Sequence, residues 1–171
     1  MTLHILSKQD TVLNKFIAQI RDKSVQKDSM RFRRNLERIG EITAYEISKE
    51  LAYSPRIVET PLGEAEVGLI DDQVVVATIL RAGLPYHQGF YFDDAENAFV
   101  SAYRKSTKDG KFTVKVEYIS CGDLEGKVLL LVDPMLATGS SLVLAYKALC
   151  EKGGTPKYTH VAAVIASEQG I

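Results

Sequence analysis

The sequence predicts an α/β protein with an open, mainly parallel sheet flanked by helices. Several short runs are apolar throughout, which is typical of strands buried on both faces of a parallel sheet. Helical patterns precede and follow these runs, and this alternation indicates an α/β fold. The chain has 171 residues, 46% of them hydrophobic and 25% charged, which fits a single globular domain over residues 1–171.

Two helices are predicted at the N-terminus. Residues 11–22 place apolar side chains on one helical face, with Asp10 or Thr11 as the cap. A longer helical pattern covers about 29–51. These helices could pack on the sheet or on a second subunit. Residues 53–68 contain two prolines and read as short extended pieces.

Strands are predicted next in the chain. The apolar runs are 74–80, 98–103, 128–132 and 160–166. Phe112–Ile119 differs because apolar and polar residues alternate, so one face is solvated. We interpret it as a β-arm or an edge strand. A further helix is expected to begin at Ser140 or Ser141 and to end at Gly153 or Gly154.

The first candidate site follows the run 128–132, because ligands of open α/β sheets bind beyond the carboxyl ends of the strands. Small residues there let the backbone approach a ligand, and the first amides of the next helix can bind an anion. A carboxylate beside such amides suits sugar hydroxyls, so the segment suggests a ribose phosphate. Alternatively, Ser140 is only a helix cap and Asp133 only a turn residue. The candidate residues are Asp133, Pro134, Met135, Leu136, Ala137, Thr138, Gly139, Ser140 and Ser141.

Two arginines provide the second signal. Arg81 follows the run 74–80 and Arg104 follows the run 98–103. An arginine can hold an anionic group bidentately, and Gly83 would permit close approach of the backbone. Parallel strands end at one edge of a sheet, so this array fits a ligand with a sugar, a monophosphate and a more negative group. Taken alone, Arg81 would be interpreted as a surface residue in a loop.

The segments "VDPMLATGSS", "ILRAGL" and "AYR" resemble the uracil phosphoribosyltransferase family. Pro134 points to this branch, because most other phosphoribosyltransferases of the fold have a second acidic residue there. The upstream segments "IRDKSVQKDSMRFRRNLERIGEITAYEIS" and "ETPLGEAEV" are also similar, so the resemblance covers essentially the whole chain. It implies a type I phosphoribosyltransferase fold. It also implies phosphoribosyl transfer from 5-phosphoribosyl 1-diphosphate (PRPP) to uracil, giving UMP and diphosphate in pyrimidine salvage.

The resemblance also implies roles for the site residues. Asp133 and the residues up to Ser141 would hold the ribose hydroxyls and the 5-phosphate, and Arg81 and Arg104 would hold the diphosphate. Asp133, Arg81 and Arg104 are therefore the expected catalytic residues. Mg²⁺ is the expected cofactor, bound through substrate and water rather than by protein ligands. A homodimer or higher homo-oligomer is implied as well.

Two departures from the family pattern stand out. Ser140 replaces a usual glycine, which costs ~1 kcal/mol if the position needs positive φ and nothing if it begins the helix, as we expect. The late G-L-G-D-A-G-D segment that reads uracil is not found. We therefore expect a domain that lacks its C-terminal uracil-binding segment. Alternatives are a non-catalytic or regulatory phosphoribosyl- or nucleotide-binding protein, and a phosphoribosyltransferase for another base.

Composition argues against other partners. The net charge is -1 and the basic stretch Arg31–Arg38 is local, so nucleic acid is not an expected partner. The apolar runs are too short for a membrane span, and the N-terminus is too polar for a signal peptide. Cys121 and Cys150 are isolated and show neither disulfide nor metal spacing. We expect a cytoplasmic protein that acts on small molecules.

Overall fold

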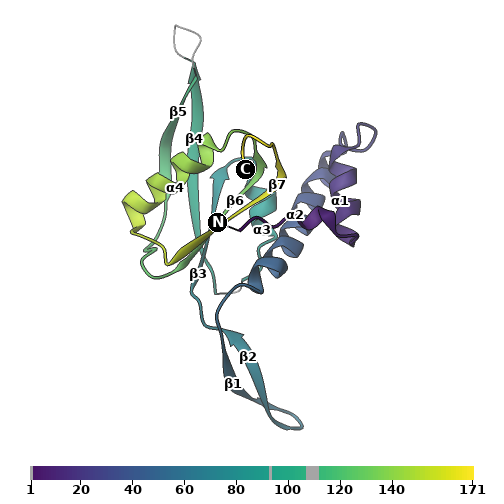
Figure 1. Ribbon diagram of the computed structural model, residues 1–171, viewed down its shortest axis with the longest axis vertical. Helices are drawn as coiled ribbons and strands as arrows, with labels where there is room; N and C mark the ends of the chain where they lie inside the picture. The colour runs from purple at the N-terminus through teal and green to yellow at the C-terminus, as the bar shows by residue number, and fades with distance from the viewer. Residues whose placement is uncertain (1, 93, 107–111) are drawn as a thin grey trace.

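The central sheet is mainly parallel, as predicted. The computed structural model describes residues 2–92, 94–106 and 112–171. The sheet has the strand order β5-β4-β3-β6-β7 (Figure 1). Strands β3, β4, β6 and β7 run parallel, and β5 is antiparallel to β4. The strands are β3 (Val74–Leu80), β4 (Glu96–Ser106), β5 (Phe112–Ser120), β6 (Val128–Leu136) and β7 (Tyr158–Ala166).

Helices cover both faces of this sheet. Figure 1 shows α2 (Ser29–Ser48) and α3 (Leu84–Gln88) on one face and α4 (Ser140–Gly153) on the other. Helix α1 (Val12–Arg21) packs on α2 and follows a short 3-10 helix, η1 (Leu6–Lys8). The N-terminal helices therefore pack against the sheet of their own chain, α2 directly and α1 through α2. Among the described residues, none of the helices is both long and apolar enough to cross a bilayer.

Two hydrophobic cores lie on opposite faces because successive strand residues point to opposite sides. Val74, Val76 and Leu130 contribute to the core beneath α2 and α3. Their neighbours Val75 and Leu129 contribute to the core beneath α4. Burial on both faces explains why these strands read as continuous apolar runs.

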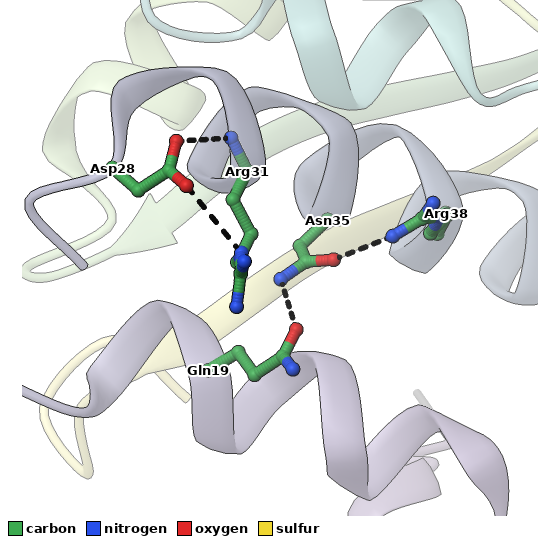
Figure 2. Close-up of polar contacts among 5 residues, drawn as sticks. All are labelled: Gln19, Asp28, Arg31, Asn35 and Arg38. Atoms are coloured by element: carbon green, nitrogen blue, oxygen red, sulfur yellow. Dashed lines mark hydrogen bonds and ion pairs between the residues drawn. The ribbon is translucent and has the colours of Figure 1, made fainter. Parts of the chain in front are cut away.

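A partly buried hydrogen bond joins α1 to α2, and further polar contacts lie within α2 and at its start (Figure 2). The Nδ2 of Asn35, which is fully buried, donates to Gln19 Oε1 at 2.9 Å. Arg38 Nη1 donates to Asn35 Oδ1 at 3.1 Å. Asp28 caps α2 by accepting from the Arg31 backbone N–H at 3.0 Å, and its carboxylate also pairs with the Arg31 guanidinium. Three arginines of the basic stretch, Arg31, Arg34 and Arg38, thus make contacts within the chain.

The arm lies elsewhere than predicted. Strands β1 (Tyr53–Thr60) and β2 (Gly63–Ile70) form a separate antiparallel hairpin that projects from the body (Figure 1). We call this hairpin the arm. The sequence predicted only short extended pieces here, because Pro55, Pro61 and Gly63 break the preceding helical pattern. Phe112–Ile119 is instead within the edge strand β5, one of its two predicted alternatives, because β4 offers it an antiparallel partner.

Candidate active site

The first candidate segment begins inside a strand. β6 continues to Leu136, so the prediction that it ends at Val132 was wrong. After Val132, β6 loses its pairing with β3, but Asp133, Met135 and Leu136 still pair with β7. Pro134 has no N–H for a ladder, and it sits where only one neighbouring strand remains. The connecting turn is therefore restricted to Ala137–Gly139, which we call the loop.

The loop leads directly into α4. Gly139 has φ 74°, a left-handed conformation that favours glycine. Ser140 is the first helical residue, and among the described residues only glycines have positive φ. The expectation that Ser140 begins the helix without strain is confirmed. It is not the cap, however, because Gly139 occupies that position.

Hydroxyl groups gather at the start of α4. Thr138 Oγ1 and Ser140 Oγ lie 3.0 Å apart, and the Ser140 N–H points to Thr138 Oγ1 at 3.4 Å. The first amides of α4 lack partners within the helix, as at any helix N-terminus. Both features are suited to a phosphate group.

Asp133 faces a hollow beside the loop. This hollow has a volume of about 200 Å³ and is lined by residues from Asp133 to Leu142. Burial raises the pKa of Asp133, although a 3.4 Å hydrogen bond from the Met135 N–H acts in the opposite direction. A second hollow of about 370 Å³ lies beyond the loop and reaches Lys147 on α4. A half-buried carboxylate thus lies beside potential anion donors.

The Arg81 segment lies at the same sheet edge. β3 ends at Leu80, and Arg81 follows as an exposed residue after a cis peptide bond. The neighbouring strand places Asp133 one position past Val132, which pairs with Thr78. The Thr78 hydroxyl donates to the Val132 carbonyl at 2.8 Å, which joins the two strands just before the site. Sequence analysis missed Thr78, whose polar side chain within an apolar run was the available signal.

Arg104 is placed differently from the prediction. β4 continues to Ser106, so Arg104 lies within a strand rather than after its end. The reason is that β5 goes on pairing with β4 after β3 has ended, and Arg104 pairs with Val114. Leu80 pairs with Ser101, which places Arg104 roughly 10 Å further along the strand direction. Its side chain lies outside the described part of the structure.

Metal ligands are sparse in this region. Among the described residues, no group of three or more His, Cys, Asp or Glu side chains could hold a metal ion. A magnesium ion commonly keeps several waters and binds substrate phosphates with few protein ligands. The oxygen donors present, the Asp133 carboxylate with the Thr138 and Ser140 hydroxyls, fit a metal that arrives with its substrate.

A family model described as uracil phosphoribosyltransferase matches residues 7–171. The chain belongs to the uracil phosphoribosyltransferase family. The uracil phosphoribosyltransferase of Porphyromonas gingivalis is 55% identical over 168 residues, covering 97% of this chain and 77% of the relative. The uracil phosphoribosyltransferase of Pyrococcus furiosus is 37% identical over 160 residues, covering 91% of this chain and 67% of the relative.

Solved structures share the fold. A protein of Aquifex aeolicus superposes with a TM-score of 0.84 at 22% identity, covering 99% of this chain and 78% of that chain. A hypoxanthine phosphoribosyltransferase from Staphylococcus aureus has a TM-score of 0.53 at 11% identity, covering 79% of this chain and 65% of that chain. The predicted uracil phosphoribosyltransferase family, phosphoribosyltransferase fold and enzyme class are confirmed. The roles of the individual site residues stay predictions.

Proposed function

We propose that this member of the uracil phosphoribosyltransferase family transfers the phosphoribosyl group of PRPP to uracil, giving UMP and diphosphate. Family membership is the observation that carries the proposal, since the family model matches 7–171. The geometry agrees with it, because a carboxylate, a helix N-terminus and an arginine meet at one sheet edge.

The loop and Asp133 would hold the ribose 5-phosphate. The phosphate would accept hydrogen bonds from the first amides of α4 and from the Thr138 and Ser140 hydroxyls. Asp133 would accept hydrogen bonds from the ribose hydroxyls in the hollow it lines. Sugar hydroxyls would then add donors to a half-buried carboxylate that already accepts one long hydrogen bond from the Met135 N–H.

Arg81 and Arg104 would bind the diphosphate. In the reaction, the bond from ribose C1 to the diphosphate oxygen breaks, a bond from C1 to uracil N1 forms, and N1 releases its proton. Negative charge builds on the departing diphosphate, where guanidinium groups are most effective. Positive charge builds on the ribose ring, where the Asp133 carboxylate would be stabilising.

Mg²⁺ is the proposed cofactor. It would neutralise charge on the diphosphate when bound with the substrate. It would be held through the substrate and water, and the Asp133 carboxylate faces the same hollow beside the loop, where it could bind such a water. Removal of divalent ions with EDTA should therefore abolish turnover without changing the thermal unfolding of the free protein.

A uracil-to-UMP assay with PRPP and Mg²⁺ tests the function. UMP formation that requires both substrates would support the proposal, and [14C]uracil gives a direct readout. PRPP binding without UMP formation would favour the alternative, a non-catalytic or regulatory phosphoribosyl-binding protein. Formation of a nucleotide only from a different base would favour a phosphoribosyltransferase for that base.

A homodimer formed through the arm is also proposed. Every residue of β2 is exposed, Leu62 at the tip is 100% exposed, and Ile57 is 62% exposed. An isolated two-stranded hairpin is at best marginally stable in water. A second copy of the chain would supply the apolar cover that the arm lacks. Light scattering should show a dimer that Ile57→Glu weakens and that the control Glu59→Gln leaves intact.

A cytoplasmic location is proposed on different grounds. Cys121 and Cys150 are both free thiols, which are typical of proteins from reducing compartments. The proposed substrates are small, charged metabolites. Fluorescence of a tagged copy in intact and fractionated cells tests the location.

A further inference from the structure

The turn Ser167–Gly170 contacts the back of the loop. It follows β7, whose last pair with β6 joins Ala166 to Leu136. The Ser167 N–H donates to the Leu136 carbonyl at 2.9 Å, and its hydroxyl donates to the Ala137 carbonyl. One residue therefore binds the last carbonyl of β6 and the first carbonyl of the loop.

Gly170 closes the turn against the same two carbonyls. The Gly170 N–H donates to the Ser167 carbonyl at 3.0 Å and lies 3.2 Å from the Ser167 hydroxyl. A Cβ at Gly170 would lie 2.7 Å from the Leu136 oxygen and 2.8 Å from the Ala137 oxygen. Those atoms are backbone atoms and cannot turn aside, so the close approach requires glycine.

These contacts bear on the direction in which the loop amides point. A loop that presents its amides to one anion directs its carbonyls elsewhere, and hydrogen bonds to those carbonyls hold the peptide groups in that orientation. Ser167 donates such bonds to the carbonyls of Leu136 and Ala137. The lining of both hollows, among the described residues, falls between Asp133 and Lys147. Ser167 thus reaches the loop from outside them.

We propose that Ser167 and Gly170 are positioning residues that fix the loop in the shape that binds the 5-phosphate of PRPP. The inference rests on the proposed function and deepens it, because it concerns the same phosphate site. Neither residue touches substrate. They act by holding the carbonyls of Leu136 and Ala137, so that the amides from Thr138 onward stay directed at the phosphate.

Calorimetric binding of PRPP and of inorganic diphosphate tests this role. In Ser167→Ala, which keeps the N–H bond to Leu136 but loses the hydroxyl, Kd for PRPP should rise roughly three- to tenfold. Diphosphate affinity should not change, because diphosphate is expected at the arginines. Ser167→Thr keeps the hydroxyl and should restore PRPP binding. Gly170→Ala should weaken PRPP binding more than Ser167→Ala.

Ser48→Ala is the matched control. Its hydroxyl also donates to a backbone carbonyl, that of Tyr45 at 2.7 Å, at the far end of α2. This variant should bind both ligands like wild type. Melting temperatures of all variants accompany the binding data, and Ser167→Ala should melt within a few degrees of Ser48→Ala.

Several outcomes would overturn the proposal. Equal PRPP affinity in Ser167→Ala, Gly170→Ala and wild type would show that the loop does not depend on this turn. Equal losses for PRPP and diphosphate, together with a large drop in melting temperature, would assign these residues a purely structural role. Wild-type protein that binds no PRPP would overturn the proposed function itself, and this inference with it.

Discussion

The Thr78 side chain occupies the space that a side chain at Gly83 would need. A Cβ at Gly83 would lie 1.9 Å from Thr78 Oγ1 and 2.8 Å from the Ile79 carbonyl oxygen. The same Oγ1 donates to the Val132 carbonyl, one residue before Asp133. Thr78 therefore packs against Gly83, which follows Arg81, and is hydrogen-bonded to the strand that carries Asp133. In this way it connects the Arg81 segment to the Asp133 segment of the site.

Gly83→Ala should lower the free energy of unfolding by about 1–3 kcal/mol, because it overpacks a site with no free space. The double variant Thr78→Ala/Gly83→Ala should lose less free energy of unfolding than the two single variants lose in sum. Urea unfolding of the four proteins measures this coupling. Additive losses would show that the two residues do not interact.

Asp133→Asn should separate stability from activity. Burial raises the pKa of Asp133, so the native state binds a proton more readily than the unfolded state. Its charged form therefore lowers stability as pH rises above about 4. The variant should melt at or above the wild-type temperature at pH 7, with the difference vanishing in acid. UMP formation should fall at least tenfold, since the carboxylate charge is lost.

Differential scanning fluorimetry from pH 3 to pH 8, with an activity assay at pH 7, checks this expectation. Asp123→Asn is a suitable control, since Asp123 is exposed and makes a local turn contact with the Glu125 N–H. A variant at position 133 that is less stable than wild type at pH 7 would contradict the account of Asp133.

Asp72 should stabilise the protein with a pH dependence opposite in sign to that of Asp133. Burial raises its pKa, but hydrogen bonds from Lys157, Tyr158 and the Ala52 N–H outweigh burial and bring it to about 2. The stabilisation is present above the unfolded pKa near 3.8 and is lost as pH falls toward 2. Asp72→Asn should remove about 1–2 kcal/mol at pH 7, allowing for solvent screening of the exposed lysine.

Chemical denaturation at pH 7 and pH 2.5 measures the Asp72 contribution. The difference between wild type and Asp72→Asn should shrink at the lower pH. Asp123→Asn makes a control, because Asp123 is exposed and makes a local turn contact with the Glu125 N–H. A difference that is the same at both pH values would argue against this assignment.

Gly139 and Ser140 should respond in different ways to substitution. Gly139→Ala should destabilise the protein by about 1–2 kcal/mol through backbone strain, since φ is 74° and the nearest atoms to a new Cβ lie 3.8 Å away. Ser140→Gly should not stabilise the protein, and should cost up to about 1 kcal/mol of helix stability. Thermal unfolding distinguishes the two. A stabilised Ser140→Gly would reveal strain at Ser140.

Arg81→Ala should weaken the binding of PRPP and the binding of diphosphate by similar factors. A charge-assisted hydrogen bond contributes about 1.5–3 kcal/mol, so both Kd values should rise roughly ten- to a hundredfold. Arg33→Ala, at an exposed position on α2, is the control and should bind normally. Calorimetry with each ligand provides the measurement. Unchanged diphosphate affinity in Arg81→Ala would remove Arg81 from the proposed site.

The agreement between sequence and structure varies by element. The runs that became β3 and β6 were found because burial on both faces leaves an unbroken apolar signal. The arm was predicted only as short extended pieces, because β2 is exposed along its whole length and Pro55 lies in β1, so no buried apolar run marks the hairpin. The end of β6 was placed too early, since pairing with β7 depends on a strand distant in the chain.

The site shows the same division. Asp133, the small residues of the loop and Arg81 could be predicted because the chemistry follows apolar runs at one sheet edge. The contacts of Ser167 and Gly170 with the loop could not, because these residues lie about thirty positions from it, as in the Ser167–Ala137 bond. Likewise, the position of Arg104 within β4 depends on how far β5 pairs along it.

The sequence by itself determined the fold class, the two-sided burial of the sheet and the identity of the phosphate-binding candidate. These properties follow from hydrophobic periodicity and from residue types that are adjacent in the chain. The tertiary structure alone decided where β6 ends, which face each helix covers and what stands behind the loop. Those features arise from hydrogen bonds and close contacts between distant segments, which local sequence patterns do not encode.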